Sequence, residues 1–435
     1  MELEELMYRQ MAQLNTDDVK LTPTQNEAYS YMAQGKSIFL TGPAGTGKST
    51  LIKLFRKVYG SQKNIAITST TGISAILLGG TTLHSYLGIG LGTGSVGALT
   101  TKILKTPYLR KKWKQVDVLI IDEVSMLDPE LFDKLEAIAR AVRYDTRPFG
   151  GIQLILSGDM CQLPVVGSDD FCFEAETWDA CVEETVYLNE IIRQTNPEFQ
   201  TCLNEARIGK LSSTSKKLLK SCLYKKLTND FGIKPTKLFP TNAQVDYMNE
   251  KELDILAEDE REFKQYDMEI EVYGSVKNRE YVLEKYRKNC IASEELQLCK
   301  DSQVMLLHNL DIDSGLVNGS RGVVTGFIED LPVVKFLNGQ ERTIDYHIWE
   351  MMDQDTKLMS ITQIPLKLAY AVTIHKIQGA TLDYAEVDLE NVFEYGQAYC
   401  AISRVRSPDG LSLTGLDFKK IKAHPKAKKY YKNLS

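Results

Sequence analysis

The chain has 435 residues, of which 43% are hydrophobic and 25% charged, and its formal net charge is −6 at pH 7. This composition is typical of a globular protein, and the length is too great for one core, so about three domains are expected. No apolar run reaches the roughly 18 residues of a membrane span, residues 1–20 lack the layout of a signal peptide, and the eight cysteines form no C-x-x-C pair. These features argue against a membrane protein, a zinc site or a disulfide framework, and they predict a soluble, intracellular protein.

The first helix signal stands just before a glycine-rich loop. Thr22 is suited to cap a helix with Pro23 in its first turn, and Gln25 follows on that helix. We expect the Gln25 amide to read the edges of an adenine base. The alternative is an ordinary exposed glutamine on a helix.

Residues 38–50 have the pattern of a phosphate-binding loop. An apolar run ends at Thr41, a loop that fits G-x-x-x-x-G-K-[ST] follows, and a helical pattern begins at Ser49. The glycines let backbone N–H groups turn toward phosphates, Lys48 is expected to reach the β- and γ-phosphates, and the Ser49 hydroxyl is expected to hold Mg²⁺. The predicted cofactors are therefore ATP and Mg²⁺. The predicted nucleotide-binding residues are Gln25, Gly42, Pro43, Ala44, Gly45, Thr46, Gly47, Lys48, Ser49 and Thr50.

Small hydroxyl residues follow the next expected strand. Strand 65–69 leads into a turn at 70–75, and residues 79–85 come next. Such side chains at the carboxyl ends of parallel strands suit contacts with a phosphate backbone. Glycine-rich residues 88–98 are expected to leave the sheet as an insertion.

The negative net charge by itself argues weakly against a nucleic-acid partner. The chain nevertheless contains two clusters of basic residues. The first cluster contains Lys102, Lys105, Arg110, Lys111, Lys112 and Lys114. The second contains Lys419, Lys420, Lys422, Lys426, Lys428, Lys429 and Lys432. A protein that moves on nucleic acid needs only one basic groove, but each cluster is equally compatible with a solvated face.

Carboxylates end the next buried strand. The apolar run from Val116 suits the central strand of a parallel sheet, and it ends in Asp122 and Glu123. Asp122 is expected to coordinate Mg²⁺ and Glu123 to polarise the attacking water. A further buried strand, 152–159, leads to Gln162, which is expected to sense the γ-phosphate.

Alternating strands and helices predict the domain organisation. The first 190 residues read as a doubly wound parallel sheet, and a second such pattern opens at 237–242 and closes at 399–406. Short strands at 300–346, with a hairpin turn at Asn338-Gly339, predict a small β-barrel inserted in the second α/β domain.

The motifs, taken in order, resemble those of the PIF (petite integration frequency) helicases of superfamily one, relatives of RecD that move 5′→3′ on single-stranded DNA. The likeness runs from about residue 21 to about residue 416. It is carried by residues 21–25, 42–49, 71–73, 79–84, 122–126, 158–164, 188–194, 316–322, 373–379 and 396–404. Val165 stands where the family usually has a second proline, and Ile377 stands where it more often has serine.

The resemblance implies two RecA-like doubly wound parallel-sheet domains with a small SH3-like β-barrel inserted in the second, an α/β fold. The expected domains are 1–188, with an insertion at about 88–114; 189–250 with 360–435; and an inserted domain at 251–359, with its barrel at about 300–346. Arg193 and Arg404 are implied as arginine fingers from the second domain, so that they meet ATP when the domains close. The implied catalytic residues are Lys48, Asp122, Glu123, Gln162, Arg193 and Arg404, with Ser49 and Asp122 at the metal. The implied DNA contacts are Thr71, Gly72, Thr82, His84, Thr373, His375 and Lys376.

The expected function is that of an ATP-dependent 5′→3′ DNA helicase acting in replication, recombination, repair or telomere maintenance. The alternative is a nucleotide switch that binds DNA without unwinding it, with 300–346 as an adaptor. The expected partners are single-stranded DNA and duplex junctions, with G-quadruplexes and RNA–DNA hybrids left open, and no membrane. We expect a monomer, located with DNA in a nucleus, or in the cytoplasm of a microbial or viral system.

Overall fold

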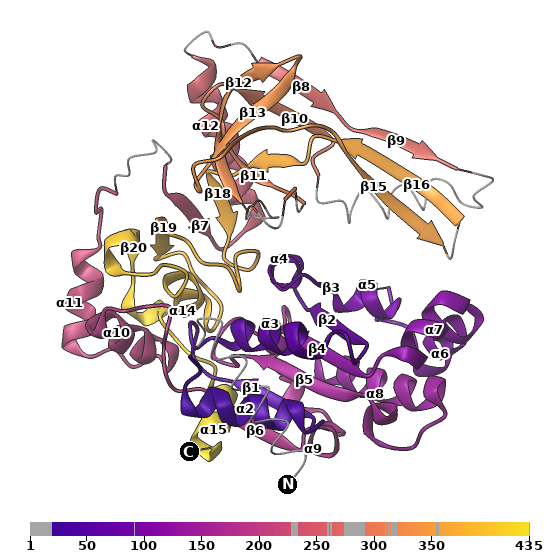
Figure 1. Ribbon diagram of the computed structural model, residues 1–435. Coiled ribbons are helices and arrows are strands. Elements are labelled where there is room, and N and C mark those ends of the chain that lie inside the picture. Colours follow the sequence, from indigo (N-terminus) through magenta and orange to yellow (C-terminus); the bar gives the residue numbers. More distant parts are fainter. Residues whose placement is uncertain are drawn as a thin grey trace. The chain divides into compact units, whose positions relative to one another are not determined.

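The computed structural model (Figure 1) describes residues 20–434 except 91, 228–233, 259, 260, 262, 274–291, 309, 312, 313, 315, 317–319, 354 and 355. It divides into two compact units. Unit 1 comprises Met1–Leu219, Phe393–Ser407 and Asp417–Ser435, and unit 2 comprises Lys220–Val392 and Pro408–Leu416. The segments 393–407 and 417–435, which the sequence analysis groups with the second domain, thus pack in unit 1.

Unit 1 is built on a six-stranded sheet with the order β3-β2-β4-β5-β1-β6, in which every neighbouring pair is parallel. The strands are β1 (Ile38–Thr41), β2 (Ile65–Ser69), β3 (Thr81–Thr82), β4 (Val118–Asp122), β5 (Gln153–Gly158) and β6 (Glu184–Tyr187). β1, β4 and β5 are buried along their whole length, as expected for parallel strands covered on both faces. The α/β fold with a parallel sheet is confirmed.

The helices of unit 1 come from three segments of the chain. They are α2 (Pro23–Ala33), α3 (Lys48–Tyr59), α4 (Gly72–Leu77), α5 (Leu83–Leu87), α6 (Val96–Lys105), α7 (Pro107–Gln115), α8 (Pro129–Arg143), α9 (Trp178–Cys181), α10 (Pro197–Arg207), α11 (Ser213–Ser221, which crosses into unit 2), α14 (Gln397–Ile402) and α15 (Pro425–Leu434). Short 3-10 turns lie at Val124–Met126, Pro148–Gly151, Cys172–Glu174 and Phe418–Lys420. Thr22 caps α2 as predicted, because its hydroxyl accepts the Gln25 N–H at 3.3 Å.

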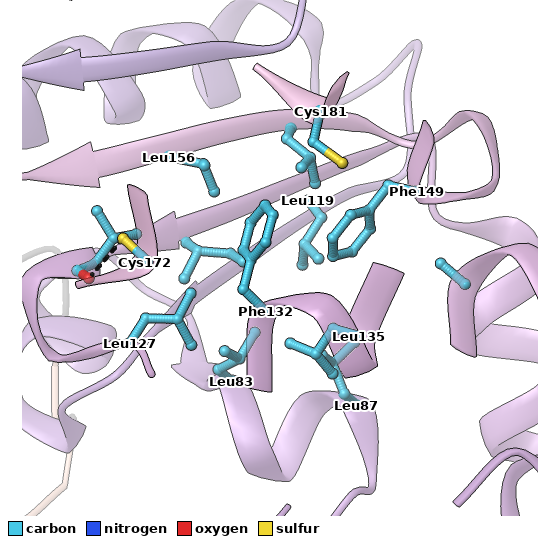
Figure 2. Packing of buried hydrophobic residues seen from close by; sticks show 14 of the residues in the cluster. Leu83, Leu87, Leu119, Leu127, Phe132, Leu135, Phe149, Leu156, Cys172 and Cys181 are labelled. Atoms are coloured by element: carbon cyan, nitrogen blue, oxygen red, sulfur yellow. Dashed lines mark hydrogen bonds between the residues drawn. The ribbon is translucent and has the colours of Figure 1, made fainter. Parts of the chain in front are cut away.

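Two hydrophobic clusters cover the two faces of this sheet. Successive side chains of β4 alternate between them: Leu119 and Ile121 belong to one cluster, and Val118 and Ile120 belong to the other. Figure 2 shows part of the first cluster, in which the Phe132 ring lies 5.7 Å from that of Phe149. Burial on both faces makes the sheet a rigid platform for the loops at its carboxyl edge.

Unit 2 contains a second, smaller parallel sheet with the order β18-β7-β19-β20. Its strands are β7 (Thr236–Phe239), β18 (Ala371–Thr373), β19 (Ala385–Leu389) and β20 (Leu411–Leu416), accompanied by α12 (Asn242–Ala257) and a 3-10 turn at Pro408–Gly410. The strand-and-helix pattern predicted to open at 237–242 is therefore present, as β7 and α12.

The rest of unit 2 is antiparallel and falls into sheets of five, three and two strands. The five-stranded sheet contains β14 (Glu341–Thr343), β13 (Leu331–Phe336), β12 (Arg321–Ile328), β11 (Gln303–Leu306) and β17 (Leu366–Leu368). The others contain β15 (His347–Asp353), β16 (Thr356–Gln363) and β9 (Glu269–Val272), and β10 (Glu295–Cys299) with β8 (Phe263–Asp267). Gly339, at φ 84°, occupies the predicted turn between β13 and β14. An SH3-like closure of these strands stays a prediction, and residues 317–319 lie outside the described residues.

None of the described helices combines the length and the apolar character that crossing a bilayer requires. The seven described cysteines, Cys161, Cys172, Cys181, Cys202, Cys222, Cys299 and Cys400, are buried free thiols.

Candidate functional site

The phosphate-binding loop connects β1 to α3 in unit 1. Gly42, Gly45 and Gly47 have φ values of 142°, 84° and 86°, a region that side chains disfavour. A side chain at position 42 would also clash with its surroundings, because a Cβ on Gly42 would lie 2.2 Å from the Leu188 carbonyl oxygen. The glycines therefore serve both the loop conformation and its close packing against the segment that follows β6.

Lys48 lies within this loop. Its ammonium donates to the carbonyl oxygens of Gly42, at 2.8 Å, and Pro43, at 2.9 Å. Burial lowers its pKa, while the carboxylates of Asp159, Glu123 and Asp122 oppose that change. A desolvated cation inside a loop of backbone N–H groups is suited to bind a polyanion such as a triphosphate.

Gln25 holds the loop from the side of α2. Its amide nitrogen donates to the Thr46 carbonyl oxygen at 2.9 Å, and its amide oxygen accepts the Thr22 N–H at 3.0 Å. The side chain is buried, which excludes the alternative of an exposed helical glutamine. Its role in adenine recognition stays a prediction.

Asp122 and Glu123 end β4 as predicted. Asp122 is buried and accepts the Ser74 hydroxyl at 2.6 Å, while its other oxygen has no hydrogen-bond donor within the described part of the chain. Glu123 has φ 56°, an uncommon conformation for a non-glycine residue that often marks a functional site. The sequence analysis did not identify Ser74, which lies on α4 in a segment with no catalytic pattern.

The donors near this strand fit a magnesium ion. Ser49 is exposed at the start of α3, and Asp122 has an oxygen available. Mg²⁺ prefers hard oxygen ligands and usually takes few from the protein, keeping the others from water and phosphate. No group of three or more His, Cys, Asp or Glu side chains that could hold a metal occurs among the described residues.

Gln162, Arg193 and Arg404 meet in unit 1. A terminal nitrogen of Arg404 lies 3.3 Å from Gln162 Oε1, and Arg193 donates to the Ser403 carbonyl oxygen at 3.3 Å. The backbone N–H of Arg193 donates to the Gly45 carbonyl oxygen at 3.1 Å. Both predicted fingers thus belong to the unit that carries the phosphate-binding loop.

The two guanidinium groups raise the local positive potential. Burial, followed by the nearby charge of Arg404, lowers the pKa of Arg193 to about 10. Arg404 is 1% exposed and its Nε donates to the Cys400 carbonyl oxygen at 2.8 Å, which fixes the head group. Two neighbouring cations beside the loop favour an anion between them and the loop.

The predicted DNA contacts divide between the units. In unit 1, Thr71 and Gly72 follow β2, Thr82 ends β3 and His84 follows it, and burial lowers the pKa of His84. In unit 2, Thr373 ends β18, and His375 and Lys376 follow it.

The unit 2 residues adjoin a cavity of about 550 Å³, which Thr373 and Lys376 line together with residues of α12 and β10. Lys367 also lines it, and burial, followed by the charge of Lys376, lowers its pKa to about 8. The sequence analysis did not identify Lys367, because no basic pattern surrounds it.

Comparison with known protein families identifies two matching regions. The family described as PIF1-like helicase matches residues 15–217, and the 2B domain of DNA helicase Pif1 matches residues 282–327. Together they include the phosphate-binding loop, Gln162, Arg193 and part of the antiparallel region.

Whole-protein relatives extend the match over nearly all of the chain. Uncharacterized protein 030L of Invertebrate iridescent virus 6 is 38% identical, covering 95% of this chain and 94% of that protein. The ATP-dependent DNA helicase PIF1 of Homo sapiens is 39% identical over 95% of this chain, which spans 64% of the length of the human protein.

Solved structures agree with these relatives. The crystal structure of Pif1 helicase from Candida albicans has a TM-score of 0.87 and 35% identity, covering 96% of this chain and 100% of that one. The Bacteroides Pif1 helicase in complex with ADP-AlF3 and single-stranded DNA has a TM-score of 0.73 and 29% identity, covering 96% and 97%. With its parallel sheet, its phosphate-binding loop and relatives that match it along nearly its whole length, the chain belongs to the PIF1-like helicase family.

Proposed function

We propose that this protein is an ATP-hydrolysing DNA helicase that tracks 5′→3′ along single-stranded DNA and unwinds duplex DNA. The observation that carries the proposal is the meeting of Gln162, Arg193 and Arg404 beside the phosphate-binding loop. A protein that only bound nucleotide would have no need of two buried arginines and an amide there. The human relative is named an ATP-dependent DNA helicase and the Bacteroides relative a Pif1 helicase, which supports the same activity here.

The hydrolytic chemistry assigns a part to each residue. Lys48 and the loop N–H groups hold the β- and γ-phosphates, with Ser49 and Asp122 as the protein ligands of Mg²⁺, which neutralises phosphate charge when bound. Glu123 polarises the water that attacks the γ-phosphorus while the bond to the β-phosphate oxygen breaks. Arg193 and Arg404 stabilise the charge that develops, an effect of about 10³–10⁵ in rate for an arginine finger.

Single-stranded DNA is the proposed track. Thr71, Gly72, Thr82 and His84 in unit 1, and Thr373, His375 and Lys376 in unit 2, are the proposed contacts. The Bacteroides relative was solved with single-stranded DNA, which supports this assignment. Duplex junctions follow as the substrate for unwinding, whereas G-quadruplexes and RNA–DNA hybrids are alternative ligands for the same residues, since contacts to phosphates do not identify the sugar.

The surface of α6 and α7 supports an anionic partner despite the negative net charge. The cluster Lys102, Lys105, Arg110, Lys111, Lys112 and Lys114 is exposed throughout. The helices are anchored by Ile103, Leu109 and Trp113, which are buried in the core. Within the described residues no carboxylate pairs with any cation of this cluster, so their positive field faces solvent.

DNA-stimulated ATP turnover tests the proposal directly. A helicase is expected to hydrolyse ATP many-fold faster when single-stranded DNA is present, because its ATPase cycle is coupled to movement along the bound strand. Phosphate release is measured with and without an unstructured oligonucleotide, with chelation of Mg²⁺ as the control that removes turnover. Slow turnover that DNA leaves unchanged would overturn the proposal in favour of a DNA-binding nucleotide switch.

A further inference from the structure

A buried carboxylate outside the predicted catalytic set lies behind the phosphate-binding loop. Asp159 follows β5 and is 0% exposed. Arg207, from the last turn of α10, donates to it through Nε at 2.9 Å and a terminal nitrogen at 2.8 Å. Although burial disfavours the charged form, Arg207 holds the pKa of Asp159 below its usual value, so the carboxylate is ionised. The two groups form a buried ion pair.

Two tyrosine hydroxyls complete the surroundings of this carboxylate. Tyr399 on α14 donates to Asp159 at 3.2 Å and accepts the N–H of Ala44 at 2.8 Å. Tyr431 on α15 donates to Asp159 at 3.2 Å and accepts the N–H of Met160 at 2.9 Å. Burial, followed by the Asp159 charge, raises the pKa of both tyrosines, so both keep their protons.

Both tyrosines also reach the nucleotide-binding strand and loop. Ala44 lies in the phosphate-binding loop itself, and the Tyr431 hydroxyl lies 2.6 Å from the Thr41 hydroxyl at the end of β1. The Gly158 carbonyl oxygen lies 2.8 Å from the Thr41 hydroxyl, whose single proton serves either this oxygen or the Tyr431 oxygen. Through the two tyrosines, the Asp159 carboxylate is therefore linked to Thr41, which precedes the loop, and to Ala44 within it.

The same cluster is tied to the γ-phosphate residues. The Gln162 N–H donates to the Asp159 carbonyl oxygen at 2.9 Å. Tyr399 lies on the helix that leads to Arg404, and a Cβ on Gly396 before this helix would lie 2.2 Å from the Gln162 carbonyl oxygen. The loop, the Gln162 segment and the Arg404 helix consequently share one buried support.

We propose that Asp159, Arg207, Tyr399 and Tyr431 form a positioning cluster that holds the phosphate-binding loop ready for ATP and makes α15 part of the nucleotide site. This inference rests on the proposed ATP-dependent function. None of the four residues is catalytic; each acts through Ala44, Thr41 or Gln162. A purely structural ion pair would have no need of hydroxyl groups aimed at a loop N–H, and apolar replacements of buried ion pairs often cost no stability.

Removal of the Tyr399 hydroxyl tests the cluster at its contact with the loop. The variant Tyr399→Phe leaves the Ala44 N–H without its acceptor, and an unsatisfied buried donor is costly enough for ATP binding to weaken about tenfold. We expect the KM for ATP to rise by about this factor and kcat to fall less. The Kd for ATP without DNA and the melting temperature are measured alongside.

A matched pair on α15 separates positioning from stability. The variant Tyr431→Phe is expected to raise the KM for ATP several-fold, and its combination with Tyr399→Phe to have less effect than the product of the two, because both hydroxyls act through Asp159. The control is Tyr430→Phe. The Tyr430 ring lies 4.2 Å from that of Phe173 and 5.6 Å from that of Tyr431, between centroids, and its hydroxyl bonds to Thr185. Phe keeps both ring contacts and removes only this hydroxyl, so we expect the variant to keep the wild-type KM even where the melting temperature falls.

Two results would overturn the cluster. One is a wild-type KM for ATP in both Tyr399→Phe and Tyr431→Phe, and the other is an equal rise in KM in Tyr430→Phe. Failure of the proposed function can be told apart from failure of the cluster. It would show in the wild-type protein, as absent ATP binding or as ATP turnover that DNA does not stimulate. These wild-type results do not depend on any tyrosine variant.

Discussion

Arg404 shows how a single charged side chain is kept in the interior of unit 1. An isolated buried guanidinium is costly, so its hydrogen bonds must be satisfied. Its Nε and a terminal nitrogen bond to the Cys400 carbonyl oxygen, at 2.8 Å, and the Ser403 hydroxyl, at 2.7 Å. A terminal nitrogen also contacts Gln162. The head group is therefore oriented before any nucleotide binds.

At the residue scale we predict that Arg404→Ala lowers the rate of ATP hydrolysis by about 10³-fold or more, equivalent to about 4 kcal/mol of barrier. Arg404→Lys is expected to rescue little, because an ammonium cannot reproduce the planar guanidinium contacts. ATP affinity is expected to change far less in either variant. Single-turnover hydrolysis and equilibrium ATP binding measure the two effects separately.

A surface arginine provides the control for this prediction. Arg140 on α8 forms an ion pair with Glu136 at 2.8 Å and is half exposed, so Arg140→Ala should hydrolyse ATP at the wild-type rate. Lys48→Ala serves as the positive control and should abolish hydrolysis while single-strand binding persists. Near-normal hydrolysis in Arg404→Ala would remove this residue from the catalytic set.

At the element scale, α6 and α7 form an amphipathic pair. Their apolar side chains join the core cluster, while their lysines and arginine face solvent. The Lys112 ammonium lies 4.8 Å from the Tyr86 ring centroid, and that of Lys114 lies 4.9 Å from the Tyr144 ring centroid. Cations interleaved with aromatic rings suit a nucleic-acid backbone better than a purely solvated face does.

The corresponding prediction concerns the salt dependence of DNA binding. Lys105, Arg110 and Lys111 have no side-chain partner within the described ranges, so replacing all three by Gln removes charge without breaking a contact. If each contacts a phosphate of single-stranded DNA, the slope of log Kd against log salt should decrease by about 2. Fluorescence anisotropy over a range of salt concentrations measures this slope.

The tail cluster is the comparison for this variant. Its Lys426 already pairs with Asp170 at 2.6 Å and with Glu174 at 3.0 Å, so neighbouring carboxylates offset part of its field. Replacing Lys419, Lys428 and Lys429 by Gln should therefore leave the slope near that of the wild type. Equal slopes for both triple variants would mean that the α6–α7 cluster is an ordinary solvated surface and does not contact DNA.

At the scale of the whole molecule, the chain passes from unit 1 into unit 2 directly after Ser407 and returns at Asp417. Arg404 thus stands shortly before β20 of unit 2 along the chain. The predicted fingers lie in the same unit as the phosphate-binding loop.

Unwinding polarity is the prediction that belongs to this scale. Duplexes with a single-stranded tail at only the 5′ or only the 3′ end are expected to give strand separation from the 5′-tailed substrate, because the translocating strand must enter in one direction. A blunt duplex controls for spontaneous melting. Unwinding confined to 3′ tails would contradict the proposed direction while leaving ATP-driven unwinding intact.

Some elements were predictable because their signals are local. The capped start of α2, the buried strands β1, β4 and β5, and the turn at Gly339 depend on residues adjacent in sequence. The hairpin of β15 and β16 was not predicted, because polar residues such as Ser360 and Thr362 interrupt the apolar run of β16. The inclusion of 393–407 and 417–435 in unit 1 was missed for a different reason. No sequence pattern within a segment shows that it packs against a core formed much earlier in the chain.

The sequence by itself determined the candidate nucleotide site, because the loop glycines, Lys48 and Ser49 are contiguous and Asp122 and Glu123 end a recognisable buried strand. Only the tertiary structure decided how that site is supported. Tyr431 and Thr41 are separated by 390 residues along the chain, and neither Asp159 nor Arg207 belongs to a pattern that requires the other. Such contacts depend on how distant segments pack, and this packing is set by the burial of the whole core rather than by any one stretch of residues.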